Sequence, residues 1–195
     1  AVAARQASHD FGKDIIPALI TELSVFAYRF YDENKKASKY WRDIGTLDAF
    51  FDANMDLCGV DPEFNLYDPE WPMRTYRRCG EALDSIISPG CIISGSRVVG
   101  SVLCPNVRVH SYGAIEQCIL MPGVRIGRHA RIRRAIIDRD VLIPRGAVIG
   151  FNPDEDRKRH TVTDLGVVVV TEDDDPLVEP ISDEALRIEA EDDGR

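Results

Sequence analysis

Aliphatic residues return at almost every sixth position between residues 86 and 150, and this period restricts the possible folds more than any other feature. They are Ile87, Ile93, Val99, Leu103, Val109, Ile115, Leu120, Ile126, Ile132, Ile137, Ile143 and Ile149. An α-helix needs apolar residues three and four positions apart, and a half-buried strand needs them two apart. A period of six instead predicts a solenoid, in which each hexad forms one short strand and three hexads complete one turn of a triangular prism.

The corners of this predicted prism repeat one turn sequence. Ile-Ser-Pro-Gly ends at Gly90, Leu-Cys-Pro-Asn ends at Asn106 and Leu-Met-Pro-Gly ends at Gly123. Gly and Asn in the last place can adopt a positive φ, which such turns require. A β-sandwich is the alternative, but it predicts alternating residues and irregular turn spacing. We therefore expect a β-solenoid.

Charge is distributed unevenly along the chain. The 195 residues are 44% hydrophobic, enough to bury the core of one or two domains, and the net charge of −9 argues against nucleic acid as a partner. The stretch from 125 to 145 is rich in arginine, at positions 125, 128, 131, 133, 134, 139 and 145. The stretch from 172 to 195 is strongly acidic, and we expect it to be disordered apart from a helical stretch within 185–190.

Cysteine usage and hydropathy predict a cytoplasmic protein. Five cysteines without a CxxC pair are typical of reduced thiols, and not of a disulfide framework or a zinc site. No apolar stretch is long enough to cross a membrane, so we expect no membrane partner. The chain starts without Met and without the apolar region of a signal peptide, and we expect it to be part of a longer protein.

The remaining segments predict a mixture of helices and strands. A short helix is expected within 11–20, and strands are expected at 23–31 and 39–44. Thr46 is expected to cap a helix with an apolar face made of Leu47, Phe50, Phe51, Met55 and Cys58. Residues 59–75 resemble a linker, 154–160 a charged loop or short helix, and 166–171 a strand.

Asp43 is the first candidate for chemistry. It lies at the end of the predicted strand 39–44, shortly before Gly45 and the helix that Thr46 caps. In an α/β sheet this edge is where ligands bind, and a carboxylate there can hold Mg²⁺ together with phosphate and water oxygens. A single Asp does not make a metal site by itself, so an Asp that merely caps the turn is the alternative.

Three motifs occur in a fixed order before the hexads. They are HDFGKDIIP at 9–17, YWRDIGT at 40–46 and WPMRTY at 71–76. With the hexads they resemble the C-terminal half of bacterial ADP-glucose pyrophosphorylase (glucose-1-phosphate adenylyltransferase), from about residue 8 to about residue 171. The resemblance implies a Rossmann-like α/β remnant of a nucleotidyltransferase domain with its linker at 1–75 and a left-handed parallel β-helix at 76–171. The acidic tail, 172–195, lies outside it.

The resemblance also implies an activity. The family joins ATP and α-D-glucose 1-phosphate to give ADP-glucose and diphosphate for glycogen synthesis, and it binds the catalytic Mg²⁺ through the Asp of W-x-D-x-G-T, here Asp43. Packing beneath the motif is the favoured interpretation of Trp41 in the same motif, and Trp41 is also the substrate-binding candidate. The family's Gly-rich nucleotide loop, its second metal-binding Asp and its sugar-binding Glu–Lys pair have no counterpart in these residues. We therefore expect the chain alone to be inactive.

The arginine-rich stretch is the second candidate site. By resemblance, Arg139 stands where the family places a basic residue on its allosteric effector, and Arg131 and Arg134 are further candidates nearby. A guanidinium group suits a phosphorylated effector because it can donate two parallel hydrogen bonds. Solvated arginines, or arginines paired with the acidic tail, are the alternative. Gly123 stands where some members have an acidic residue, which leaves the effector's identity open.

Two other functional classes remain as alternatives. One is a non-catalytic β-helix module for oligomerisation and effector binding; the resemblance implies a homotetramer in either case. The other is a hexapeptide-repeat acyltransferase, which would depend on His110 or His129 and not on Asp43. An upstream Gly-Gly-x-Gly-x-Arg segment would favour the adenylyltransferase.

Overall fold

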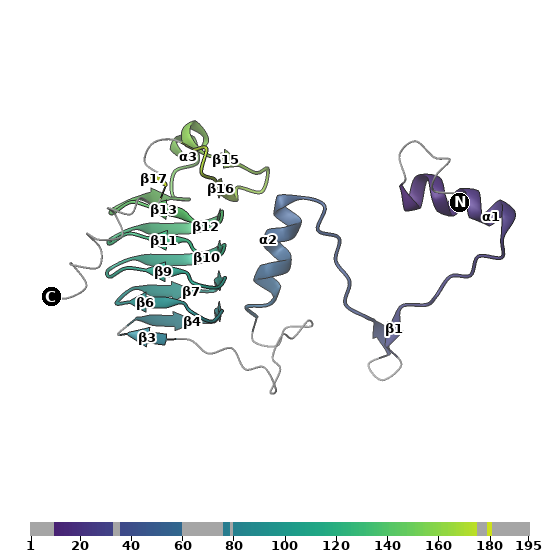
Figure 1. Ribbon diagram of the computed structural model, residues 1–195, viewed down its shortest axis with the longest axis horizontal. Coiled ribbons are helices and arrows are strands. Elements are labelled where there is room, and N and C mark those ends of the chain that lie inside the picture. Colours follow the sequence, from purple (N-terminus) through teal and green to yellow (C-terminus); the bar gives the residue numbers. More distant parts are fainter. Residues whose placement is uncertain (1–9, 33–35, 60–75, 79, 175–178, 181–195) are drawn as a thin grey trace. The chain divides into compact units, whose positions relative to one another are not determined.

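Parallel strands that stack in steps of 16 or 17 residues form the larger part of the protein (Figure 1). The computed structural model describes residues 10–32, 36–59, 76–78, 80–174 and 179–180. The chain divides into two compact units between Trp41 and Arg42, and each unit is described by itself below.

The strands of the second unit form the three faces of a prism, which we call faces A, B and C. Face A contains β3 (Tyr76–Arg78), β6 (Ile92–Ser94), β9 (Arg108–Val109), β11 (Arg125–Ile126) and β13 (Val141–Ile143). Face B contains β4 (Glu81–Leu83), β7 (Arg97–Val99), the first halves of β10 (Ala114–Leu120) and β12 (Arg131–Ile137), and β14 (Val148–Ile149). Face C contains β5 (Ile86–Ile87), β8 (Val102–Leu103), the second halves of β10 and β12, and β16 (Val168–Val170).

The strand register confirms the predicted solenoid. Ile115 pairs with Val98 and with Ile132, each 17 positions away, and Ile93 pairs with Val109, 16 positions away. Steps of six that shorten once per coil produce these coil lengths. Equivalent aliphatic side chains therefore stack on one another inside the prism, where most of the predicted set is buried.

The predicted inward position is wrong at Val99. Val98 is completely buried and pairs with the inward Ile115, whereas Val99 is only half-buried. The corner that begins at Gly95 is one residue shorter than a hexad predicts, so the inward side chain comes five positions after Ile93. A regular six-residue count cannot detect such a shortened corner.

The corners adopt the predicted turn geometry. Gly90, Asn106 and Gly123 have φ values of 82°, 63° and 78°. Asp140 takes the same place in the next coil, with a φ of 55°. The Pro-Gly and Pro-Asn pairs thus predicted the corners correctly.

An insertion interrupts the last coil. Arg131 of β12 pairs with Val148, 17 residues later, but Ala135 of the same strand pairs with Val168, 33 residues later. The additional residues contain α3 (Pro153–Arg159) and β15 (Thr161–Val162), which pairs antiparallel with β16. The predicted charged segment is therefore a helix, and the strand predicted at 166–171 is confirmed with narrower bounds.

The helix predicted after Thr46 is α2 (Leu47–Asp56), and it packs on the coil (Figure 1). The Thr46 side chain accepts a hydrogen bond from the Ala49 N–H at 3.1 Å, as expected of a cap. Phe51 is only 2% exposed and packs with residues of face C and of the segment 167–169, namely Ile119, Ile136, Val167 and Val169. Of the predicted apolar face, Phe51 is the fully buried member.

The first unit contains less regular structure than predicted. A five-residue π-helical segment (Phe11–Ile15) leads into α1 (Ile16–Glu22), which confirms the predicted helix, with Pro17 in its first turn. The predicted strand 23–31 is wrong, because 23–30 forms no ladder with any part of the chain that the structure describes, and pairing is limited to β1 (Tyr31–Asp32) with β2 (Ala37–Ser38). The predicted strand 39–44 is also irregular. β-rich composition makes a strand only where another strand satisfies its backbone groups. Beyond the β1–β2 ladder, the described residues join these two segments by the hydrogen bond from the Lys39 N–H to the Phe30 carbonyl at 3.3 Å, which does not extend the ladder.

The start of the acidic tail differs from the disorder expected for it. The Asp174 carboxylate accepts a hydrogen bond from the Thr171 N–H at 2.8 Å and lies 3.1 Å from Nδ1 of His160. β17 (Glu179–Pro180) pairs antiparallel with β13. The predicted linker, apart from Gly59, and the helical stretch within 185–190 lie outside the described residues.

Candidate functional site

Asp43 lies in the irregular segment that leads into α2, and not at the end of a strand as predicted. Its side chain is exposed, and its carboxylate lies beside Gly45. The neighbouring Arg42 pairs with Asp56, with 2.7 Å between Nη2 and Oδ2. The helix predicted after Asp43 is therefore confirmed, and the strand predicted before it is wrong.

One exposed carboxylate fits a role as a single Mg²⁺ ligand. Magnesium is commonly bound through one or two carboxylates, with substrate phosphates and water filling its other positions. Within the described ranges, no group of three or more His, Cys, Asp or Glu side chains could hold a metal ion. Asp43 is thus compatible with an ion that is shared with a phosphorylated substrate.

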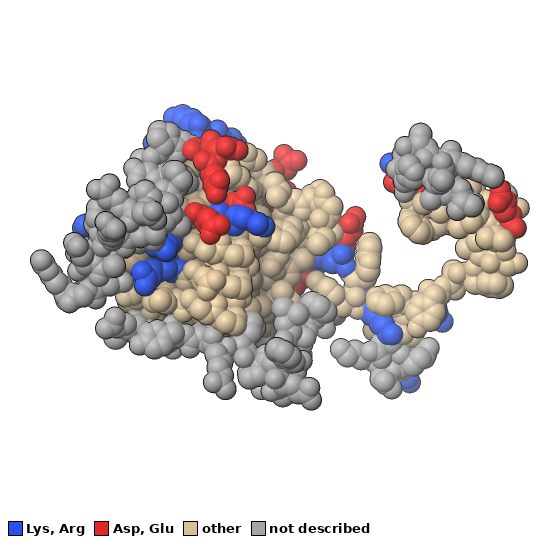
Figure 2. Space-filling view, viewed as in Figure 1, with Lys and Arg blue, Asp and Glu red and all other residues tan. Residues whose placement is uncertain are grey.

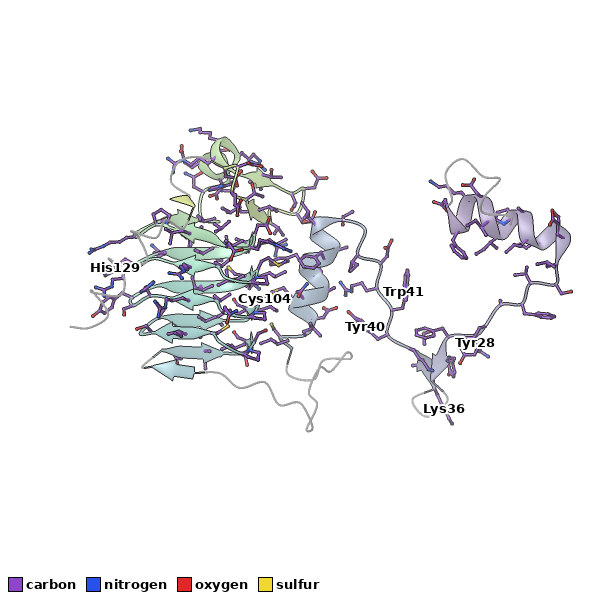
Figure 3. The ribbon with its side chains drawn as sticks, in the orientation of Figure 1. Tyr28, Lys36, Tyr40, Trp41, Cys104 and His129 are labelled. Carbon is purple, nitrogen blue, oxygen red and sulfur yellow. The ribbon has the colours of Figure 1, made fainter. Side chains whose placement is uncertain are left out.

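Trp41 is 74% exposed and lies on the irregular segment after β2, next to Tyr40 (Figure 3). Tyr40 is half-buried, so of the two aromatic side chains Trp41 is the more open to solvent. This exposure means that Trp41 packs little against the described residues. An exposed indole can stack on a sugar or base.

The three predicted effector arginines lie at different places around one coil. Arg131 begins β12 on face B and is exposed, while Arg134 lies at the corner between faces B and C with a φ of 49°. Arg139 is exposed in the turn between faces C and A, where its backbone N–H donates to the Asp138 carboxylate at 2.7 Å. Face C thus separates Arg139 from Arg134.

Sequence reasoning missed the aromatic partners of these arginines. The guanidinium carbons of Arg131 and Arg133 lie 4.7 Å and 5.4 Å from the ring centre of Phe151. That of Arg134 lies 5.5 Å from the ring centre of Phe51. Such cation–π contacts hold a guanidinium in place without neutralising it. Residues 20 and 83 positions away supply the rings, so no local pattern could have indicated them.

Charged side chains of both signs gather near α3 in the view of Figure 2. The first turn of α3 carries Asp154, Glu155 and Asp156, and its last turn carries Arg157, Lys158 and Arg159. This arrangement complements the helix dipole. The pairing of Lys158 with Glu155 at 2.6 Å lowers the pKa of the Glu155 carboxyl.

Burial keeps the described cysteines in the thiol form. Cys58, Cys91, Cys104 and Cys118 are free thiols, and burial raises the pKa of each. The pKa of the completely buried Cys118 rises to about 12. Cys79 lies outside the described residues.

The two histidines of the acyltransferase alternative lie in different surroundings. His110 is 4% exposed, inside the coil. His129 is exposed and stacks on Tyr112, with 5.0 Å between the ring centres and 16° between the planes.

None of the helices within the described residues has the length and apolarity that a membrane span requires.

Comparisons with known proteins agree with the resemblance. A family model described as "GlmU-like, C-terminal hexapeptide" matches residues 72–170, and one described as "Nucleotidyl transferase" matches residues 1–59. A glucose-1-phosphate adenylyltransferase of Koribacter versatilis is 48% identical over 179 residues, which cover 85% of this chain and 43% of that protein. One of Methylobacillus flagellatus is 49% identical over 185 residues, covering 86% of this chain and 43% of that protein.

These matches confirm the predicted resemblance and the presence of both a nucleotidyltransferase part and a hexapeptide-repeat part. The chain spans less than half the length of these relatives and matches their C-terminal part. Asp43 falls within the stretch that the nucleotidyltransferase model matches. Arg131, Arg134 and Arg139 fall within the hexapeptide stretch.

Proposed function

Because this chain belongs to the GlmU-like C-terminal hexapeptide family and matches the C-terminal part of glucose-1-phosphate adenylyltransferases, we propose that it is the C-terminal part of such an enzyme. The whole enzyme makes ADP-glucose and diphosphate from ATP and α-D-glucose 1-phosphate for glycogen synthesis. Two matches carry this proposal, namely nucleotidyl transferase at 1–59 and the hexapeptide coil at 72–170. A cytoplasmic location accompanies the use of ATP.

In this reaction an oxygen of the sugar phosphate attacks the α-phosphorus of ATP. A new P–O bond forms there, the bond between the α-phosphorus and the bridging oxygen breaks, and diphosphate leaves. Asp43 would hold a Mg²⁺ ion through its exposed carboxylate, and the bound ion would neutralise negative charge on the phosphates. Trp41 offers its exposed indole as a stacking surface for substrate.

The test compares ADP-glucose synthesis by this chain alone with that of a joined chain. In the joined chain, the N-terminal part of the Koribacter versatilis relative precedes these 195 residues. We expect activity only in the joined chain. Activity of the 195 residues alone would contradict the expected dependence on the N-terminal part, and an inactive joined chain would contradict the assignment.

The role of Asp43 is tested in the joined chain by Asp43→Asn. Loss of a metal ligand removes several kcal/mol of charge stabilisation, so kcat/KM should fall by about 100-fold or more. Asp164→Asn is the matched control, since Asp164 is an exposed carboxylate in the turn between β15 and β16. Equal activities of the two variants would exclude the metal role of Asp43.

The proposal includes an allosteric effector that carries phosphate, such as AMP or a phosphorylated sugar, bound by Arg139. Arg131 and Arg134 are further candidates, although face C separates Arg134 from Arg139. A charged hydrogen bond contributes about 1.5–3 kcal/mol, so Arg139→Ala should raise the half-saturating effector concentration about tenfold or more. Arg145→Ala, which removes an exposed arginine at another corner, is the control. Equal shifts would contradict the role of Arg139.

The proposal also includes assembly into a homotetramer, the state that the resemblance implies. Solenoid proteins of one chain type commonly form closed symmetric assemblies. Sedimentation equilibrium of the joined chain measures the mass directly. A monomer or a dimer would contradict the tetramer without affecting the assigned reaction. A non-catalytic role for the coil in oligomerisation and effector binding is the alternative if the joined chain is inactive.

A further inference from the structure

Two residues that flank Asp43 in the chain, Arg42 before it and Thr46 after it, both contact α2. Before it, the Arg42 guanidinium pairs with Asp56, the last residue of α2, at 2.7 Å. After it, the Thr46 side chain accepts a hydrogen bond from the Ala49 N–H at 3.1 Å. Both contacts join the segment to the same helix. The position of the Asp43 backbone therefore depends on the position of α2.

α2 is itself attached to the coil at two places. In its first turn, the Asp48 carboxylate accepts a hydrogen bond from the Thr163 hydroxyl. One turn later, Phe51 is 2% exposed against the hydrophobic cluster of face C and residues 167–169. The Arg134 guanidinium lies 5.5 Å from the centre of the Phe51 ring. The coil thus contacts the N-terminal half of α2, which is the part of the helix nearest to Asp43 in the sequence.

The Thr163 hydroxyl is held firmly where it meets Asp48. It accepts a hydrogen bond from the Val167 N–H at 3.0 Å, and the Thr163 N–H donates to the Val167 carbonyl at 2.9 Å. Thr163 thus belongs to the turn that joins β15 to β16 of face C. A hydrogen bond to a carboxylate is about twice as strong as one between neutral groups. A fixed donor therefore meets the first turn of α2.

We infer that Asp48 and Thr163 are positioning residues, which hold Asp43 in the place where it binds its cation. They act through α2, supported by the packing of Phe51, and the coil thereby becomes part of the support of the metal ligand. This inference rests on the metal role proposed for Asp43. The precision required explains the arrangement, since a misplacement of about 1 Å can cost about 100-fold in rate.

The first test measures hydrogen exchange in the 195-residue chain. Asp48→Ala or Thr163→Val should make the amides of Ala49 and Phe50 exchange about tenfold faster, because each loses a charged hydrogen bond that holds the first turn. The double variant should exchange no faster than the faster single variant, since both changes remove one interaction. Thr163→Ser keeps the hydroxyl and should exchange as the unchanged chain does. Thr161→Val, in the same hairpin with an exposed side chain, is the control.

The second test measures the Mg²⁺ dependence of ADP-glucose synthesis by the joined chain. Residues that orient a metal ligand commonly contribute about 10- to 100-fold in affinity or activity. Thr163→Val should therefore raise the Mg²⁺ concentration for half-maximal activity about tenfold. The KM for glucose 1-phosphate should not change, and Thr163→Ser should restore the Mg²⁺ dependence. A purely structural role would lower stability without this selective shift.

Unchanged exchange in both single variants would overturn the inference, and so would faster exchange with an unchanged Mg²⁺ dependence. An additive double variant would also overturn it, because the two side chains would then act separately. If the joined chain without substitutions is inactive, the proposed function fails. The exchange rates in the 195-residue chain still show whether Asp48 and Thr163 hold the segment around Asp43.

Discussion

Gly146 and Gly150 share a left-handed backbone but have different surroundings. Their φ values are 75° and 81°. A Cβ on Gly146 would have no atom within 4 Å, whereas a Cβ on Gly150 would overlap the carbonyl oxygen of Arg133. The two positions therefore separate the cost of the backbone conformation from the cost of a close approach.

Gly146→Ala should lower the free energy of unfolding by about 1–2 kcal/mol, the cost of a left-handed non-glycine residue. Gly150→Ala should lower it by about 2–5 kcal/mol, because the backbone of β12 must also move. Urea unfolding of both variants provides the comparison. Equal losses would mean that the coil adjusts freely at Gly150.

Cys118 makes stability depend on pH in alkaline solution. Its pKa is about 12 in the folded protein, against about 8.5 in an unfolded chain. Its contribution is therefore fully present below about pH 8.5 and is lost as the pH rises toward 12, by about 1.4 kcal/mol per pH unit. Urea unfolding at pH 8 and pH 10 measures the loss. Cys118→Ala should be less sensitive to this change, and an equal sensitivity would contradict the assignment to Cys118.

At the scale of elements, one side chain of α2, Phe51, is expected to contribute most of the packing energy between this helix and face C. Phe50 and Phe51 are adjacent, but Phe51 is 2% exposed and Phe50 is only half-buried. Phe51→Ala should cost about 3–5 kcal/mol, the range for a buried aromatic residue. Phe50→Ala, the matched control, should cost less. Thermal unfolding compares them, and equal costs would contradict the packing of α2 on face C.

The strands that the sequence predicted wrongly are segments that find no parallel or antiparallel neighbour among the described residues. Residues 23–31 and 39–44 have the composition of strands, but within the described residues the ladder of this region is limited to Tyr31 and Asp32 with Ala37 and Ser38. The coil strands are only two to seven residues long and yet form, because each has a parallel neighbour one coil away. Pairing, and not composition, therefore decided which of these runs became strands.

At the scale of the whole molecule, the two units should resist proteolysis differently. The segment around Arg29, Lys36 and Lys39 is exposed and mostly without regular pairing, whereas the coil has a continuous buried core. Brief trypsin treatment should cut at these residues and leave a fragment that includes residues 80–171. Mass spectrometry of a time course identifies the fragments. Protection of the whole chain would contradict this expectation.

The sequence by itself determined the coil, its corners, the helix after Thr46 and the family. These features follow from short-range signals, namely a six-residue period, Pro-Gly pairs and a capping Thr. The candidate residues Asp43, Trp41 and Arg139 came from motif resemblance in the same way. Even here the regular count failed at Val99, where a corner is one residue short.

Only the tertiary structure decided how the candidate residues are supported. Asp48 and Thr163, which share a hydrogen bond, are 115 positions apart. Phe51 packs against residues of β10, β12 and β16 and of the turn before β16. Arg131, Arg134 and Arg139 are close together in the sequence but lie at different faces and corners of the prism. Contacts of this kind depend on how many residues each coil and insertion contains. The physical reason is that a solenoid brings side chains together across its coils, at distances along the chain that no local pattern encodes.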